Sequence, residues 1–99
     1  MIRFIVLFKL VDHSSENVAL IREHIMNLEG KIDVLKQMEV GSNLLYGERS
    51  FDLSATFDFD SIEALHRFEH DPLHVKIVGL IKPSVADIKT VIYENKDRS

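Results

Sequence analysis

Residues 2 to 11, with the sequence IRFIVLFKLV, are almost continuously apolar and rich in β-branched and aromatic side chains. Successive side chains of a strand point to opposite faces, so Phe4 and Phe8 lie on one face and Ile5 lies on the other. A strand that is apolar on both faces has to be covered on both. This segment therefore predicts a sheet with helices on one face and a second layer on the other.

The next part of the chain predicts a helix and a strand. Ser14 or Ser15 is placed to cap the helix, whose apolar side chains recur at helical spacing until Gly30 offers a C-terminal stop. A second strand is predicted from Val34, followed by a loop over residues 41–50 that contains two glycines.

Residues 51–59, FDLSATFDF, alternate strictly between apolar and polar side chains. This pattern predicts a third strand with one face in the core and one polar face, which carries Asp52 and Asp58. Six residues of strand separate these carboxylates by about 20 Å, too far for joint acid–base work. Tyr46 in the preceding loop and Tyr93 near the C-terminus are interpreted as packing residues.

Two helices and a last strand complete the pattern. Asp60 with Glu63 has the form of a capping box and opens the first of these helices. Asp71 caps the second, with Pro72 at the first helical position, and Pro83 ends it. The predicted elements, in order, are a strand at 2–11, a helix from about 15 to 30, strands from 34 and at 51–59, helices from 61 and at 72–82, and a strand at 87–94.

This order is the split βαβ pattern of an α+β, ferredoxin-like fold with a four-stranded antiparallel sheet. We expect one domain over residues 1–94 and a flexible polar tail at 95–99. The helices cover one face of such a sheet. The most direct cover for the other face is the sheet of a second copy, so we expect a homodimer that forms an α/β barrel.

Composition excludes several partners. The net charge is −4 and the lysines and arginines are scattered, so no basic stripe is available for nucleic acid. No segment approaches the ~20 apolar residues that span a bilayer, so we expect no membrane association. The absence of cysteine excludes disulfides and thiolate metal sites and favours a reducing, cytoplasmic location. Strong cofactor and metal motifs are absent, and we expect neither group.

The histidines leave alternatives open. His70 and His74 have the spacing of a metal-binding pair, but the helix break at Asp71 and Pro72 separates them. A metal site would need the turn to bring them together with Asp71. Otherwise His70 is a surface residue, and His74 is either a hydrogen-bonded, partly buried side chain or a ligand-facing base. The field at a helix N-terminus favours a neutral imidazole at His74. Lys9 faces either an enclosed space or water at the strand end.

The segments VLFKL, GKIDVLKQMEVG and HDPLHVK followed by IKP resemble the stress-responsive A/B barrel domain, or Dabb domain, of the dimeric α/β-barrel superfamily. The resemblance implies a stress-responsive protein with the barrel dimer predicted above. Some similar plant proteins are polyketide cyclases, and their catalytic histidine corresponds to His74. Their other polar pocket positions correspond to Phe4, Ile25 and Phe68.

Because those three positions are apolar, the resemblance favours a dimer that holds a small hydrophobic ligand or has a structural role. The alternative is a cofactor-independent enzyme, cyclase-like or monooxygenase-like, with His74 as the general base.

Overall fold

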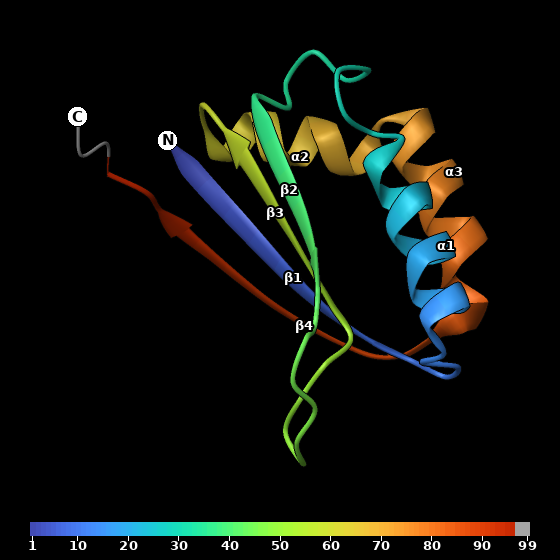
Figure 1. The fold of residues 1–99 in the computed structure, drawn as a ribbon. Coiled ribbons are helices and arrows are strands. Elements are labelled where there is room, and N and C mark those ends of the chain that lie inside the picture. The colour runs from blue at the N-terminus through green and yellow to red at the C-terminus, as the bar shows by residue number, and fades with distance from the viewer. Residues whose placement is uncertain (97–99) are drawn as a thin grey trace.

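A computed structural model of the chain describes residues 1–96 and confirms the ferredoxin-like α+β fold. The sheet is antiparallel, with strand order β2-β3-β1-β4, so β1 and β3 are central. Figure 1 shows the helices gathered on one side of this sheet. The elements are β1 (Ile2–Leu10), α1 (Ser15–Met26), β2 (Gln37–Ser42), β3 (Leu53–Phe59), α2 (Ile62–His70), α3 (Pro72–Ile81), a 3-10 turn η1 (Lys82–Ser84) and β4 (Val85–Glu94).

The core lies between the sheet and the helices. Val6 of β1 is buried and pairs with Ala55 of β3 on one side and with Thr90 of β4 on the other. Partners in an antiparallel register point to the same face, so this row faces the helices. The predicted grouping of Phe4 and Phe8 on one face of β1, with Ile5 on the other, agrees with this register.

Several predicted boundaries are wrong. α1 ends at Met26, and the chain continues in turns through Gly30, which has a φ of 73° that suits glycine. β2 begins at Gln37 instead of Val34, because turns occupy the preceding residues, and it includes the first two residues of the predicted loop. The cap of α2 is Ser61, whose hydroxyl accepts from the Ala64 N–H at 3.1 Å, instead of Asp60.

The carboxylates expected on a polar face are buried, each only 3% exposed. Asp58 accepts two hydrogen bonds from the Arg3 guanidinium, at 2.9 and 3.0 Å. These bonds raise the pKa of Arg3 above its usual range, with a further contribution from Tyr93. The charge of Asp58 is therefore balanced by Arg3 on the neighbouring strand β1, and this ion pair links the two strands.

Asp52 is held in a similar way at the other end of β3. Its carboxylate accepts the Leu10 N–H at 2.7 Å and the Tyr46 hydroxyl at 2.8 Å. The bond to Asp52 raises the pKa of Tyr46 above its usual value. Tyr46 is thus an exposed side chain whose hydroxyl is hydrogen-bonded to Asp52. The prediction that it is a packing residue is wrong.

The second face of the sheet is apolar where β1 meets β4. Ile5 pairs with Val91 there, and Leu7 and Tyr93 lie on the same face, away from the helices. Val91 and Tyr93 are 52% and 40% exposed. Within residues 1–96, no element covers this surface, which we call the open face. Among the helices of residues 1–96, none is long and apolar enough to cross a membrane. Of the predicted tail at 95–99, residues 97–99 lie outside the described residues.

Candidate functional site

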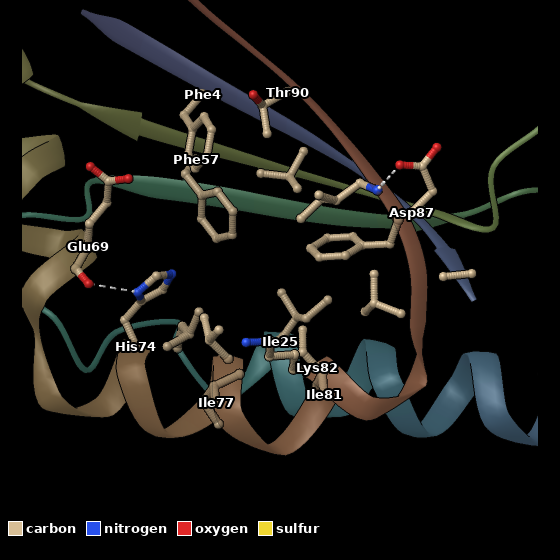
Figure 2. A pocket seen from close by; sticks show the side chains of 17 residues that line it. Phe4, Ile25, Phe57, Glu69, His74, Ile77, Ile81, Lys82, Asp87 and Thr90 are labelled. Carbon is tan, nitrogen blue, oxygen red and sulfur yellow. Dashed lines mark hydrogen bonds between the residues drawn. The ribbon is translucent and has the colours of Figure 1, made fainter. Parts of the chain in front are cut away.

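An apolar cavity of about 560 Å³ lies between α3 and the strands β1 and β4. Figure 2 shows the rings of Phe4 and Phe57 on the strand side of this space and the aliphatic side chains of Ile77 and Ile81 on the helix side. Its apolar lining comes mainly from Phe4, Val6, Phe8, Ile25, Leu28, Phe57, Ile77, Val78, Ile81, Val85 and Ile88. A cavity of this volume and composition is suited to a small, largely apolar molecule.

The cavity exists because the helices do not extend over β4. α3 packs against α1 and α2, while every β4 residue from Ala86 to Glu94 is exposed. Ile88, on the helix side of the sheet, is 49% exposed although it is apolar. The space between α3 and the outermost strand therefore stays unfilled by this chain.

The start of α3 places His74 at the cavity. Asp71 caps the helix by accepting the Leu73 N–H at 2.9 Å, and Pro72 occupies the first helical position, as the sequence predicted. His74 is then the third residue of α3 and is partly buried. The break between α2 and α3 turns its ring back toward the end of α2.

The hydrogen bond at one ring nitrogen defines the chemistry of His74. Its Nδ1 lies 3.1 Å from the carbonyl oxygen of Glu69, which can only accept, so Nδ1 carries a hydrogen and donates. In the neutral imidazole, Nε2 then has a free lone pair. Figure 2 shows this second nitrogen pointing into the cavity, away from Glu69. His74 can accept a hydrogen bond or a proton from a molecule held there.

Three of the four predicted pocket residues meet at this cavity, and the fourth lies behind it. Phe4, Ile25 and His74 line the space. Phe68 is fully buried in the core, with its ring 4.5 Å from the His74 ring between centroids. Phe68 therefore supports the imidazole from behind and does not present itself to a ligand.

The other candidates from the sequence lie elsewhere. The Nδ1 of His70 donates a hydrogen bond to the carbonyl oxygen of His66 at 2.8 Å. Neither of these two histidines lines the cavity that His74 lines. Among residues 1–96, no three side chains of the kinds that bind metals come together. Lys9 is exposed and lies over the Phe51 ring at 5.9 Å from its centroid, away from the cavity.

Sequence reasoning missed the charged residues at the cavity. Glu69, Lys82 and Asp87 also line it. Lys82 follows His74 by eight residues, slightly more than two helical turns, and this spacing is the one signal that could have associated them. The contribution of Asp87 depends on the pairing of β4 with β1, which a single sequence does not reveal.

The comparisons with known proteins agree with the fold described above. The family model for the stress responsive A/B barrel domain, Dabb, matches residues 2–95. The chain belongs to this family. Two of the solved structures below are themselves described as ferredoxin-like, in agreement with the sheet described above.

A dimeric protein of unknown function with a ferredoxin-like fold from Bacteroides fragilis is 28% identical, with a TM-score of 0.81 over 95% of both chains. A dimeric ferredoxin-like protein of unknown function from Thermobifida fusca is 25% identical, with a TM-score of 0.81 over 93% of this chain and 88% of that one.

Hydroxynitrile lyase from Passiflora edulis is 20% identical, with a TM-score of 0.79 over 99% of this chain and 96% of the lyase. At that identity the similarity shows a shared fold and no more. The comparison with curated proteins gave no match.

Proposed function

We propose that this Dabb protein is a homodimer that binds a small, largely apolar molecule in the cavity beside α3. The ligand donates a hydrogen bond to His74 while its apolar part contacts Phe4, Ile25 and the neighbouring side chains. The observation that carries the proposal is the free Nε2 of His74, pointing into a cavity of about 560 Å³ with a mostly apolar lining. An acceptor in such surroundings gains most from a ligand that supplies an O–H or N–H donor.

The binding test compares two probes of similar shape. 1-Naphthol carries a hydroxyl donor, and 1-methoxynaphthalene has a methyl ether at the same position. We expect the protein to bind 1-naphthol about fivefold more tightly, which corresponds to about 1 kcal/mol for one hydrogen bond. Isothermal titration calorimetry measures both dissociation constants.

The variants His74→Phe and His70→Phe assign the preference to one residue. Replacing His74 removes the acceptor and should abolish the preference for naphthol, whereas replacing His70, which lies outside the cavity, should leave it intact. Equal affinity of the unmodified protein for the two probes would contradict the role given to His74. Failure of both probes to bind would contradict the binding function itself.

The dimer is supported by the apolar open face and by the dimeric state described for the proteins from Bacteroides fragilis and Thermobifida fusca. A glutamate at position 91 would place a charge among apolar groups. We expect Val91→Glu to give a monomer in light scattering at micromolar concentration. Leu20→Glu, an exposed position on α1, is the matched control and should stay dimeric. A monomeric unmodified protein would refute this part of the proposal.

A second function is favoured by the same nitrogen. A neutral imidazole with a fixed tautomer and a free Nε2 can act as a general base toward a weakly acidic group in the cavity. In this alternative the protein is an enzyme without a cofactor, and His74 abstracts a proton from a C–H beside a carbonyl group. The shared fold of the Passiflora edulis lyase makes a catalytic site in this architecture physically reasonable.

Proton abstraction is tested directly by exchange of the α-hydrogens of 2-tetralone for deuterium, followed by NMR in D2O. If the alternative is correct, the protein accelerates exchange by about 100-fold, the lower end for a positioned base, and His74→Ala abolishes the acceleration. An acceleration that survives in His74→Ala would exclude His74 as the base. Binding of 2-tetralone without accelerated exchange would leave binding as the function.

A further inference from the structure

We propose that the cavity takes amphipathic anions, with Lys82 as the subsite for the anionic group. The inference rests on the binding function proposed above and names the class of ligand. On this view the ligand is a carboxylate with an apolar body, such as a medium-chain fatty acid. Its carboxylate pairs with Lys82, its body lies along the apolar wall, and a second polar group, where present, reaches His74.

The first observation is the charge balance of the cavity lining. Glu69, Lys82 and Asp87 are the side chains there that carry a full charge at neutral pH. The Glu69 carboxylate lies 3.1 Å from His66 Nδ1, and the Asp87 carboxylate lies 3.8 Å from Lys89 Nζ. Asp87 also accepts the Ile88 N–H at 2.8 Å. Both acids therefore have partners within the chain.

Lys82 differs from the two acids. Within residues 1–96 its ammonium group has no carboxylate within ion-pair distance. A cation at the edge of an apolar cavity attracts an anion that can also use the apolar wall. Because Lys82 is exposed, water also solvates its ammonium group, so an anionic ligand gains the modest stabilisation of a surface ion pair.

The second observation is the spacing of the two polar groups. Lys82 directly follows α3 and keeps a helical backbone, so eight residues separate it from His74 along one helical path. At 1.5 Å per residue, their Cα atoms are about 12 Å apart along the axis. Figure 2 shows both residues on the α3 side of the cavity, with Ile77 and Ile81 between them. A ligand that spans them needs an apolar body between two polar ends.

The test uses decanoate and 1-decanol, which share a chain and differ in charge. Each is titrated against protein that holds the fluorescent probe N-phenyl-1-naphthylamine, and displacement gives the dissociation constant. We expect Lys82→Gln to weaken decanoate binding about fivefold and decanol binding less than twofold, the size typical of a partly exposed charge pair. The Lys82 effect should shrink at 0.5 M NaCl, because salt screens the pair.

Lys76→Gln is the matched control, because Lys76 lies on α3, is exposed and does not line the cavity. It should change neither dissociation constant. Equal effects of Lys82→Gln on decanoate and decanol, or equal effects of the two lysine variants, would overturn the anionic subsite. If decanol and 1-naphthol bind while decanoate shows no dependence on Lys82, the binding function stands and this inference alone fails. If no probe binds, both fail.

Discussion

The core between the sheet and the helices has two unequal halves. Beneath α2, the ring centroids of Phe59 and Phe68 are 5.0 Å apart, and both side chains are fully buried. The Phe57 ring, with its centroid 5.2 Å from that of Phe68, lies at the border between this region and the cavity, which it also lines. Beneath α3, the same sheet borders a cavity of about 560 Å³, and Ile88 on its far side is half exposed. We call these regions the filled half and the open half.

The difference supports the proposal that the filled half stabilises the fold and the open half binds a ligand. Protein interiors are normally packed as densely as organic crystals, and each unfilled volume in a core lowers stability. A domain of 99 residues buries only about two thirds of its unfolded surface, so it has little stability to lose. The open half, with its free imidazole nitrogen, is therefore consistent with the ligand proposed above.

The largest expected effect comes from making the same truncation in each half. Phe68→Ala in the filled half should lower the free energy of unfolding by about 4 kcal/mol, because it removes a fully buried ring and leaves a cavity. Phe4→Ala in the open half should lower it by about 1 kcal/mol, since Phe4 is partly exposed and already borders empty space. Urea denaturation followed by circular dichroism measures both values.

The truncations also separate stability from binding. Phe4→Ala should weaken 1-naphthol binding, because it removes part of the apolar wall. Equal losses of stability in the two variants would mean that the cavity is closed in solution, and the contrast between the halves would disappear.

A smaller effect is expected from enlarging a side chain in each half. Ala55 and Thr90 flank Val6 on the same face of the sheet, with Ala55 fully buried and Thr90 exposed above the cavity. Ala55→Leu should lower the free energy of unfolding by about 2 kcal/mol, because a packed core has no room for the added carbons. Thr90→Leu should change it by less than about 0.5 kcal/mol.

Thr90→Leu should nevertheless weaken 1-naphthol binding, because the leucine occupies ligand space. Thermal unfolding and calorimetric titration of the two variants provide the measurements. A Thr90→Leu variant as unstable as Ala55→Leu would show that β4 packs on the helices in solution. Unchanged naphthol affinity would place the ligand elsewhere.

Local patterns predicted single elements in both halves. The alternation over residues 51–59 identified Phe57 and Phe59 as core residues, and the Asp71-Pro72 step placed the start of α3 at the correct residue. These features depend on neighbours within a few positions along the chain. The cap at Ser61 was missed because Asp60 and Ser61 are both good caps, and the choice depends on backbone geometry.

Features that depend on remote contacts were not predictable. Asp52 and Asp58 do occupy the face away from the helices, but their burial depends on Leu10, Tyr46 and Arg3, which reach them only through strand pairing and loop closure. The position of Phe68 behind His74 depends on how α2 packs on the sheet. The cavity depends on β4 lying beyond the reach of α3, and no pattern in either segment encodes that distance.

The smallest expected effect concerns the caps of the two neighbouring helices. Asp71 caps α3 above the open half, and Ser61 caps α2 above the filled half, each by accepting a backbone N–H. Asp71→Ala and Ser61→Ala should each lower the free energy of unfolding by about 1 kcal/mol, the typical value for a lost cap. By stability alone, the two variants should be nearly indistinguishable.

Ligand binding should distinguish them. His74 lies three residues after Asp71, and its bond to the Glu69 carbonyl spans the junction that Asp71 holds, so fraying there releases the imidazole from its fixed tautomer. Asp71→Ala should therefore reduce the preference for 1-naphthol over 1-methoxynaphthalene, while Ser61→Ala leaves it unchanged. Calorimetric titration of both probes against the two variants measures this preference. If both variants keep the full preference, the cap has no part in orienting His74, and the Phe68 ring and the Glu69 carbonyl are sufficient to hold it.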